Sequence, residues 1–244
     1  MNTEREIASR WLNGPRKAWV HPARSGHPVD CLLFLDGELY TDRVKASEMI
    51  RESEAAGLLP AMNCVYLPNS SAAGRHADYT CNESFASFVA LEMPQWIERE
   101  VGRFDRLFLC GLSLSGLQAV YTALKHRGVF SGVLSQSPSA WWRDEWLVNS
   151  LAPAGTERNR FWLSVGKQEL QENVSHPPTP LFQKASQLDS VRRLTAAMTV
   201  AGHEVHRHEY NGGHDPVCWG AELPDALAWL SGSRFPMLTR GSTS

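Results

Sequence analysis

Six short apolar runs, each bounded by turn-forming residues, alternate along this chain with longer stretches of helical periodicity. Most of these runs are apolar on both faces, as strands must be when helices cover both sides of their sheet. The alternation therefore predicts an α/β fold with a mostly parallel central sheet and helices on both faces. The six predicted strands are Cys31–Asp36, Met62–Leu67, Arg106–Cys110, Gly132–Ser135, Phe161–Val165 and Val205–Tyr210.

Five further stretches have the spacing of amphipathic helices. Gly57 ends the first of them, as a C-terminal glycine does, and Pro94 predicts a kink in the second. The Pro-rich stretch Ser175–Pro180 is interpreted as a surface loop. The predicted helices are Thr41–Ala56, Phe85–Ile97, Leu117–Lys125, Leu181–Val200 and Ala221–Leu230.

The N-terminal segment fits two different structures. Ile7–Leu12 and Lys17–His21 could pair as an antiparallel hairpin around a turn at Asn13-Gly14, and a helix from Thr3 with Glu6 in a capping box competes with it. No internal repeat or linker marks a domain boundary. At roughly 100–200 residues per domain, we expect residues 1–244 to form a single domain.

Composition and charge exclude several classes of partner. Lys plus Arg number 24 and Asp plus Glu number 26, a net charge of −2 that offers no basic surface for nucleic acid. The apolar runs are far shorter than the roughly 18 residues of a membrane helix, and the first residues lack the apolar core of a secretory signal. With five cysteines, an odd number, we expect a reduced, cytoplasmic protein. The oligomeric state stays open.

The window from Arg106 to Lys125 reads as a strand, a sharp turn and a helix, with Ser113 at the turn. Such a nucleophile elbow lifts a serine oxygen clear of the sheet and sets it at the positive end of the helix. Small residues must flank the turn, and Gly111 and Gly116 supply two of them. Ser115 stands where the pattern G-x-S-x-G has its second glycine, and it is a minor rival nucleophile.

A glycine-rich loop containing His214 follows the last predicted strand. This position places the imidazole at the carboxyl edge of the same sheet as Ser113, where open α/β sheets bind ligands. A histidine can act there as the general base that activates the serine. The order of serine before histidine matches that of α/β-hydrolases.

A carboxylate is expected to orient this imidazole from the loop after the strand Phe161–Val165. Glu169 ranks first, and Glu172, one helical turn further on, ranks second. Asp215 adjoins His214, and because adjacent side chains usually diverge it is better interpreted as a loop-structuring residue.

Two backbone N–H groups are expected to form an oxyanion hole. One belongs to Leu114, directly after the serine. The other is assigned to Glu38, in a turn whose conformation Gly37 would permit. An Asp-Gly turn without a catalytic role is an equally common reading of the same residues.

Three histidines near the last strand, His203, His206 and His208, form an H-x-x-H-x-H cluster. No Cys or carboxylate cluster of suitable spacing joins them, so the sequence favours a solvated strand face over a zinc site. We expect no metal and no cofactor.

Taken together, these motifs resemble the catalytic domain of the enterochelin (enterobactin) esterases. These belong to the broader putative-esterase family of α/β-hydrolases, which includes esterase D and the mycolyltransferases. The resemblance extends from about Arg16 to Leu230. It rests on Leu33–Gly37, Arg75 with Cys81-Asn82 and Phe85, the elbow Gly111–Gly116, the tract LSQSPSAWW that begins at Leu134, and Gly212–Asp215 with Cys218-Trp219.

The resemblance implies an α/β-hydrolase fold and a serine esterase in which Ser113 is the nucleophile and His214 the base. It also implies a small-molecule ester as substrate, a tricatecholate siderophore trilactone or its iron complex. Arg75 would then lie near the site, where a cation suits an anionic ferric catecholate, and Trp141 and Trp142 would wall the cleft with aromatic faces. For the two tryptophans, hydrophobic packing at a sheet edge is the alternative.

Two other functions stay open at the level of sequence. A general short-chain carboxylesterase or thioesterase unrelated to iron would use the same residues. A catalytically inactive binding protein that retains the hydrolase fold is favoured by Ser115 and by the choice among several acids.

Overall fold

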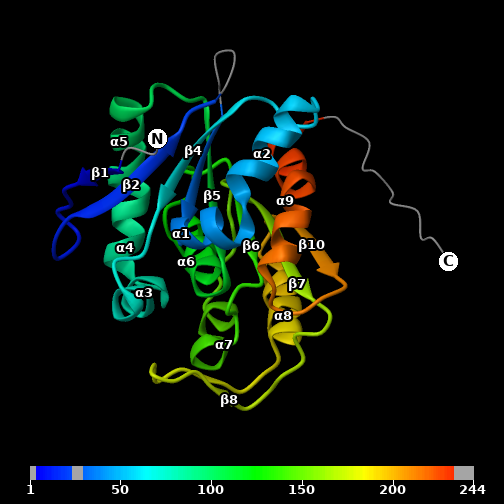
Figure 1. Cartoon of the computed structure of the whole chain (residues 1–244). Helices are drawn as coiled ribbons and strands as arrows, with labels where there is room; N and C mark the ends of the chain where they lie inside the picture. The colour runs from blue at the N-terminus through cyan, green and yellow to red at the C-terminus, as the bar shows by residue number, and fades with distance from the viewer. Residues whose placement is uncertain (1–3, 24–29, 234–244) are drawn as a thin grey trace.

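The structure, a computed structural model, describes residues 4–23 and 30–233. An eight-stranded sheet runs through it in the order β1-β2-β4-β3-β5-β6-β7-β10 (Figure 1). The six strands β4, β3, β5, β6, β7 and β10 are parallel to one another, and β2 is antiparallel to both β1 and β4. The strands are β1 (Glu4–Ile7), β2 (Arg16–His21), β3 (Asp30–Leu35), β4 (Met62–Leu67), β5 (Arg106–Leu112), β6 (Gly132–Gln136), β7 (Arg160–Gly166) and β10 (Glu204–Tyr210).

All six strands predicted from the apolar runs are present, and they are the six parallel ones. The N-terminal segment forms a hairpin, but its strands differ from the predicted ones. β1 ends at Ile7, which pairs with Arg16, so residues 8–15 form a connecting loop and the expected strand Ile7–Leu12 with a tight Asn13-Gly14 turn is wrong. Thr3, the start of the competing helix, lies outside the described residues, and Glu6 lies on β1.

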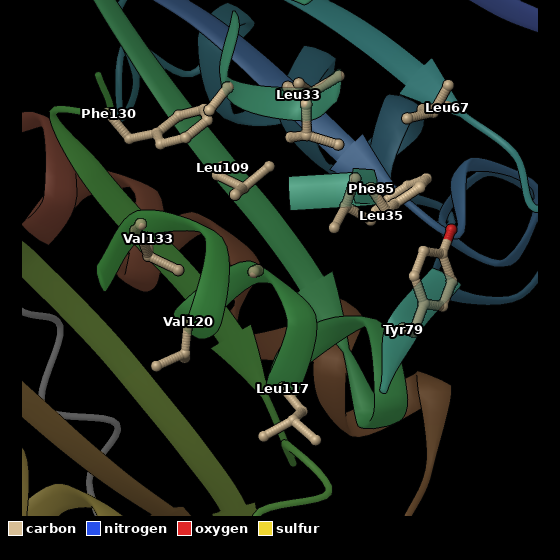
Figure 2. Close-up of a cluster of buried hydrophobic side chains, with 14 of the residues drawn as sticks. Leu33, Leu35, Leu67, Tyr79, Phe85, Leu109, Leu117, Val120, Phe130 and Val133 are labelled. Carbon is tan, nitrogen blue, oxygen red and sulfur yellow. The ribbon is translucent and has the colours of Figure 1, made fainter. Parts of the chain in front are cut away.

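Helices cover both faces of the sheet. One face packs against a π-helical turn η1 (Tyr40–Val44), α2 (Ala46–Ala55) and α9 (Pro216–Ser231). The opposite face packs against α4 (Glu83–Ser87), a second π-helical turn η2 (Phe88–Glu92), α5 (Met93–Glu100), α6 (Ser113–Lys125) and α8 (Gln187–Val200). Figure 2 shows part of this second interface, in which Leu33 of β3, Leu109 of β5 and Val133 of β6 belong to one buried cluster with Leu117 and Val120 of α6. The predicted α/β fold, with a mostly parallel central sheet and helices on both faces, is therefore confirmed.

Several predicted helix boundaries are wrong. The helices are interrupted by backbone features that the spacing of apolar residues does not reveal. Thr41–Ala56 is divided where Lys45 adopts a left-handed conformation with φ of 62°. The second helix contains η2 before Pro94, which lies in the first turn of α5. Leu181 precedes a short strand, and α8 begins only after Ser186, whose side chain caps it.

Other elements differ from the prediction in extent. α6 and α9 begin earlier than expected, at Ser113 and Pro216. Of the predicted loop Ser175–Pro180, Ser175 ends the short strand β8 (Val174–Ser175), and the rest lies in the loop that joins it to β9 (Phe182–Gln183) in a small hairpin. The missed helices are α1 (Gly37–Leu39), α3 (Ala72–Tyr79) and α7 (Trp142–Asn149).

In the part of the chain that the structure describes, no helix combines the length and the apolar character needed to cross a membrane. The lower end of the molecule in Figure 1 carries α3, α7 and the β8–β9 hairpin. The segments that follow β3, β4, β5, β6, β7 and β10 contain the residues singled out as a possible site.

The crossing of β5 and α6 depends on glycine at position 111. A Cβ atom on Gly111 would lie 2.3 Å from the carbonyl oxygen of Ser115, a contact with backbone that no rotamer change can relieve. A Cβ atom on Gly116 would lie 2.9 Å from the Ser135 hydroxyl oxygen. These contacts explain the small residues around the turn, since α6 can approach the sheet only where side chains are missing.

We predict that Gly111→Ala lowers the free energy of unfolding by about 1–3 kcal/mol or more, because it overpacks this crossing. Chemical denaturation monitored by circular dichroism measures the effect. Gly213→Ala is the matched control, because a Cβ atom there has no neighbour within 4 Å, and it should shift stability by about 0.5 kcal/mol or less. Equal stability of the two variants would contradict the prediction.

Candidate active site

Ser113 lies at the turn between β5 and α6 with φ of 54°, in the left-handed region that few non-glycine residues adopt. Its carbonyl oxygen accepts a hydrogen bond from the Ser139 N–H at 3.0 Å, which ties the turn to the loop after β6. The side chain lines a cleft and stands at the first residue of α6. This strained conformation is that of a nucleophile elbow.

Ser115 replaces the second glycine of the elbow, and the sharp turn between β5 and α6 still forms. The side chain is fully buried. Its hydroxyl accepts from the Leu112 N–H at 3.0 Å and donates to the Leu112 carbonyl oxygen at 2.8 Å. Because this hydroxyl is committed to the end of β5 and does not line the cleft, Ser115 is no rival nucleophile.

Glu169 is the carboxylate that the structure places against the imidazole. Its Oε2 lies 2.6 Å from His214 Nδ1. The two lower-ranked candidates lie elsewhere: Glu172 is exposed, and Asp215 caps α9 by accepting from the Val217 N–H at 2.9 Å. Asp215 is thus the loop-structuring residue that its position beside His214 indicates.

The second oxygen of Glu169 is held from three directions. Oε1 accepts from the Gly166 N–H at 2.7 Å and from the Ser137 hydroxyl at 2.7 Å, and the Tyr210 hydroxyl lies 3.1 Å away. Burial disfavours the charge on this side chain. The hydrogen bond and charge of His214, together with hydrogen bonds from Ser137 and Gly166, outweigh burial and lower the pKa of Glu169. The group is therefore ionised at neutral pH and accepts the Nδ1 proton of His214.

Sequence reasoning missed the residues that hold Glu169 in place. Ser137 adopts φ of 43° and is buried. The Trp219 Nε1–H approaches both the Ser137 hydroxyl, at 3.1 Å, and the Tyr210 hydroxyl, at 2.9 Å. The Trp219 ring also meets His214 edge to face, with centroids 4.8 Å apart. The sequence signals for this group are the tract LSQSPSAWW, which contains Ser137, and the pair Cys218-Trp219. Neither reveals a contact with the residues around Glu169.

Ser113, Glu169 and His214 line one cleft of about 500 Å³. Among the residues that the structure describes, no hydrogen bond joins Ser113 to His214; the two side chains share the wall of the cleft, and such contacts often tighten only when substrate binds. A serine on an elbow, a carboxylate-oriented imidazole and a neighbouring cleft are the components of nucleophilic acyl transfer.

The loop after β3 takes a different form from the expected turn. The left-handed residue is Asp36, with φ of 53°, and not Gly37. Gly37 is needed because a Cβ atom there would lie 2.8 Å from the Leu67 backbone nitrogen, and it packs against β4 without lining the cleft. Glu38 follows in the first turn of α1, where helical N–H groups lack intrahelical partners. Leu114, the other expected oxyanion donor, lines the cleft.

Arg75 lines the cleft, but its guanidinium is paired. Nε and Nη2 form a bidentate ion pair with Asp36, with Nη2 2.7 Å from Oδ2. Burial disfavours the charge of the guanidinium, yet Asp36 overcomes this effect and keeps the pKa of Arg75 above its usual value. Asn69 donates to both Asp36 and Glu38. These contacts fix the loop that carries the Glu38 N–H.

The two tryptophans occupy different places. Trp141 lines the cleft, stacks on His176 with centroids 5.1 Å apart, and donates to Gln187. Trp142 does not line the cleft; it lines an adjoining hollow and meets Trp146 edge to face at 6.0 Å. The expectation that both rings wall the cleft is wrong for Trp142, because α7 begins at this residue and turns it toward Trp146.

The histidine cluster is not a simple solvated strand face. His203 is buried, His206 stacks on Trp162 with centroids 4.1 Å apart, and His208 Nδ1 lies 2.7 Å from the buried Glu222. The hydrogen bond to Glu222 raises the pKa of His208. Within the described ranges, no three His, Cys, Asp or Glu residues gather closely enough to hold a metal ion.

The chain is similar to known esterases over most of its length. The model of a family described as putative esterase matches residues 9–230. The chain is similar to iron(III) enterobactin esterase from Dickeya dadantii, with 27% identity over 91% of this chain and 53% of that protein. It is also similar to iron(III) enterobactin esterase from Escherichia coli K12, with 25% identity over 90% and 54%.

A solved structure shares the fold. The enterobactin esterase from Shigella flexneri, solved in the presence of enterobactin, superposes with a TM-score of 0.80 at 23% identity, over 96% of this chain and 60% of that one. The chain spans about half the length of the curated relatives named above.

We predict that Glu169→Gln slows the reaction of Ser113 with a fluorophosphonate probe roughly 10³–10⁴-fold, because an amide no longer favours the correct imidazole tautomer. Stopped labelling reactions read by mass spectrometry give the rate. Glu172→Gln makes the same chemical change at an exposed position and should label like the unmodified chain. Equal rates for both variants would show that Glu169 is not the orienting acid.

Proposed function

Because this chain belongs to the putative esterase family, we propose that it is a serine esterase that hydrolyses carboxylic esters through an acyl-enzyme. The observation that carries this proposal is the 2.6 Å contact between Glu169 and His214, in the same cleft as Ser113 on its strained turn. The catalytic residues in this proposal are Ser113 as nucleophile, His214 as general base and Glu169 as the orienting acid.

In the proposed mechanism, the Ser113 hydroxyl attacks the ester carbonyl while His214 Nε2 accepts its proton. The Glu169 carboxylate keeps the proton of His214 on Nδ1 and stabilises the imidazolium that forms. The N–H groups of Leu114 and Glu38 receive the negative charge of the tetrahedral intermediate, and each such donor contributes roughly 3 kcal/mol. The intermediate collapses to the acyl-enzyme as the C–O bond to the alcohol breaks and His214 gives its proton to the leaving oxygen. Water then attacks the acyl-enzyme with His214 as base, and the acid leaves as Ser113 regains its proton.

For the substrate, we propose a siderophore trilactone of the enterobactin type. The names of the two curated relatives, both iron(III) enterobactin esterases, support this choice. The indole of Trp141 at the cleft wall suits the aromatic rings of such a ligand. The guanidinium of Arg75, although paired with Asp36, keeps donors at the cleft wall for an anionic ferric catecholate.

Three further expectations stay predictions: a single domain over residues 1–244, a cytoplasmic location, and action without a cofactor or nucleic-acid partner. None of them enters the proposed mechanism, which uses only side chains and backbone groups of the cleft.

We predict that Ser113→Ala abolishes hydrolysis of both enterobactin and p-nitrophenyl acetate, because the other hydroxyl residues that line the described cleft, Ser139 and Thr179, do not stand at the elbow turn. Ser131→Ala is the matched control, since this serine is exposed. Liquid chromatography follows the siderophore, and absorbance follows the aryl ester.

The ratio of the kcat/KM values for the two substrates tests the proposed siderophore substrate. We expect kcat/KM for enterobactin to exceed that for the aryl acetate by at least about tenfold, since the trilactone gains contacts along the cleft. A preference for the acetate would favour a general carboxylesterase. Unchanged activity in Ser113→Ala would refute the mechanism itself.

A further inference from the structure

A second hollow of about 410 Å³ meets the cleft at the catalytic pair. Ser113, His214 and Arg75 line both spaces. The cleft extends toward α3 and the β8–β9 hairpin, whereas the second hollow extends toward η1 and the start of α9. We call this second space the Arg43 hollow; its other walls are Leu39, Arg43, Val44, Leu112, Pro216 and Trp219.

The Arg43 hollow has a positive charge that nothing in its wall balances. Arg43 is exposed, and its guanidinium has no acidic partner within the described residues. No Asp or Glu is among the described residues that line the hollow. The charge of Arg75 is balanced by Asp36, so Arg43 supplies the excess charge. The remaining walls are largely apolar.

The backbone that carries Arg43 is firmly held. Its neighbour Val44 is buried, as is Tyr40 at the start of η1, whose hydroxyl donates to Gln136 at 3.0 Å. A Cβ atom on Gly220 would lie 2.7 Å from the Val44 carbonyl oxygen, so α9 packs directly on η1. A guanidinium on such a rigid element loses less freedom when it binds an anion than one on a mobile loop does.

The position of the hollow indicates which part of an ester it receives. In acyl transfer the imidazole gives its proton to the leaving oxygen, so the leaving alcohol lies on the imidazole side of the scissile bond. His214, Pro216 and Trp219 form that side of the Arg43 hollow. The acyl part then extends into the larger cleft.

We propose that the Arg43 hollow binds the leaving alcohol of the ester and that Arg43 recognises a carboxylate on it. This inference rests on the proposed esterase function. The ligand class is a hydroxy acid esterified through its hydroxyl. Opening a trilactone of hydroxy-acid units produces such an ester, because the linear chain ends in a free carboxylate beside its last ester bond. A guanidinium pairs with a carboxylate in bidentate geometry.

The test compares two small esters that differ only in the predicted group. N-benzoyl-O-acetylserine carries the carboxylate, and N-benzoyl-O-acetylserinamide carries a neutral amide in its place. For the unmodified chain we expect kcat/KM to be about tenfold higher for the carboxylate ester, mainly through KM. This preference should fall as salt concentration rises, because the guanidinium is exposed.

In Arg43→Gln the preference for the carboxylate ester should disappear because kcat/KM falls about tenfold for that ester and far less for the amide ester, and Arg43→Lys should keep part of the preference. Arg99→Gln is the matched control: it removes one positive charge from an exposed position on α5 and should leave the preference intact. Equal loss on both esters in Arg43→Gln, or no preference in the unmodified chain, would overturn the assignment of the hollow.

The two proposals fail in distinguishable ways. If the unmodified chain hydrolyses p-nitrophenyl acetate and both serine esters at equal kcat/KM, the esterase function stands and the role of Arg43 is refuted. If it hydrolyses none of the three esters, both proposals are refuted together.

Discussion

The arrangement of the site depends on one buried carboxylate. Glu169 is nearly inaccessible to solvent, and a charge in that position is tolerated only if hydrogen-bond donors replace the lost water. A backbone N–H, a serine hydroxyl and an imidazole supply them. The same contacts that make the charge tolerable also fix its orientation, so the stability of this group and its chemical use have one physical origin.

Each donor to this carboxylate comes from a loop or strand end at the carboxyl edge of the parallel sheet. Gly166 ends β7, Ser137 follows β6, and His214 follows β10. Neighbouring parallel strands bring these ends together although up to 77 residues separate them along the chain, as the numbers 137 and 214 show. The serine joins them because β5 lies beside β6 and ends at Leu112, the residue directly before Ser113. The sheet therefore acts as the rigid support that a preorganised site requires.

Much of this could be predicted from the sequence because the signals are local. Apolar runs marked the six parallel strands, and the glycine pattern around Ser113 and the loop of His214 marked two site residues. The break at Lys45, the burial of Ser137 and the pairing of Arg75 with Asp36 could not be predicted in this way. They depend on contacts between distant segments. Nothing in the local sequence around Ser137 distinguishes a residue that supports the catalytic carboxylate from an ordinary loop residue.

The measurement that tests this account most directly is proton NMR of the imidazole hydrogen between His214 Nδ1 and Glu169 Oε2. The account predicts a far-downfield resonance that is lost in Glu169→Gln and kept in Glu172→Gln. The second imidazole–carboxylate pair, His208 with Glu222, can give a similar signal, which His208→Gln identifies. A His214 resonance that persists in Glu169→Gln would show that another group holds the imidazole and would contradict the central claim.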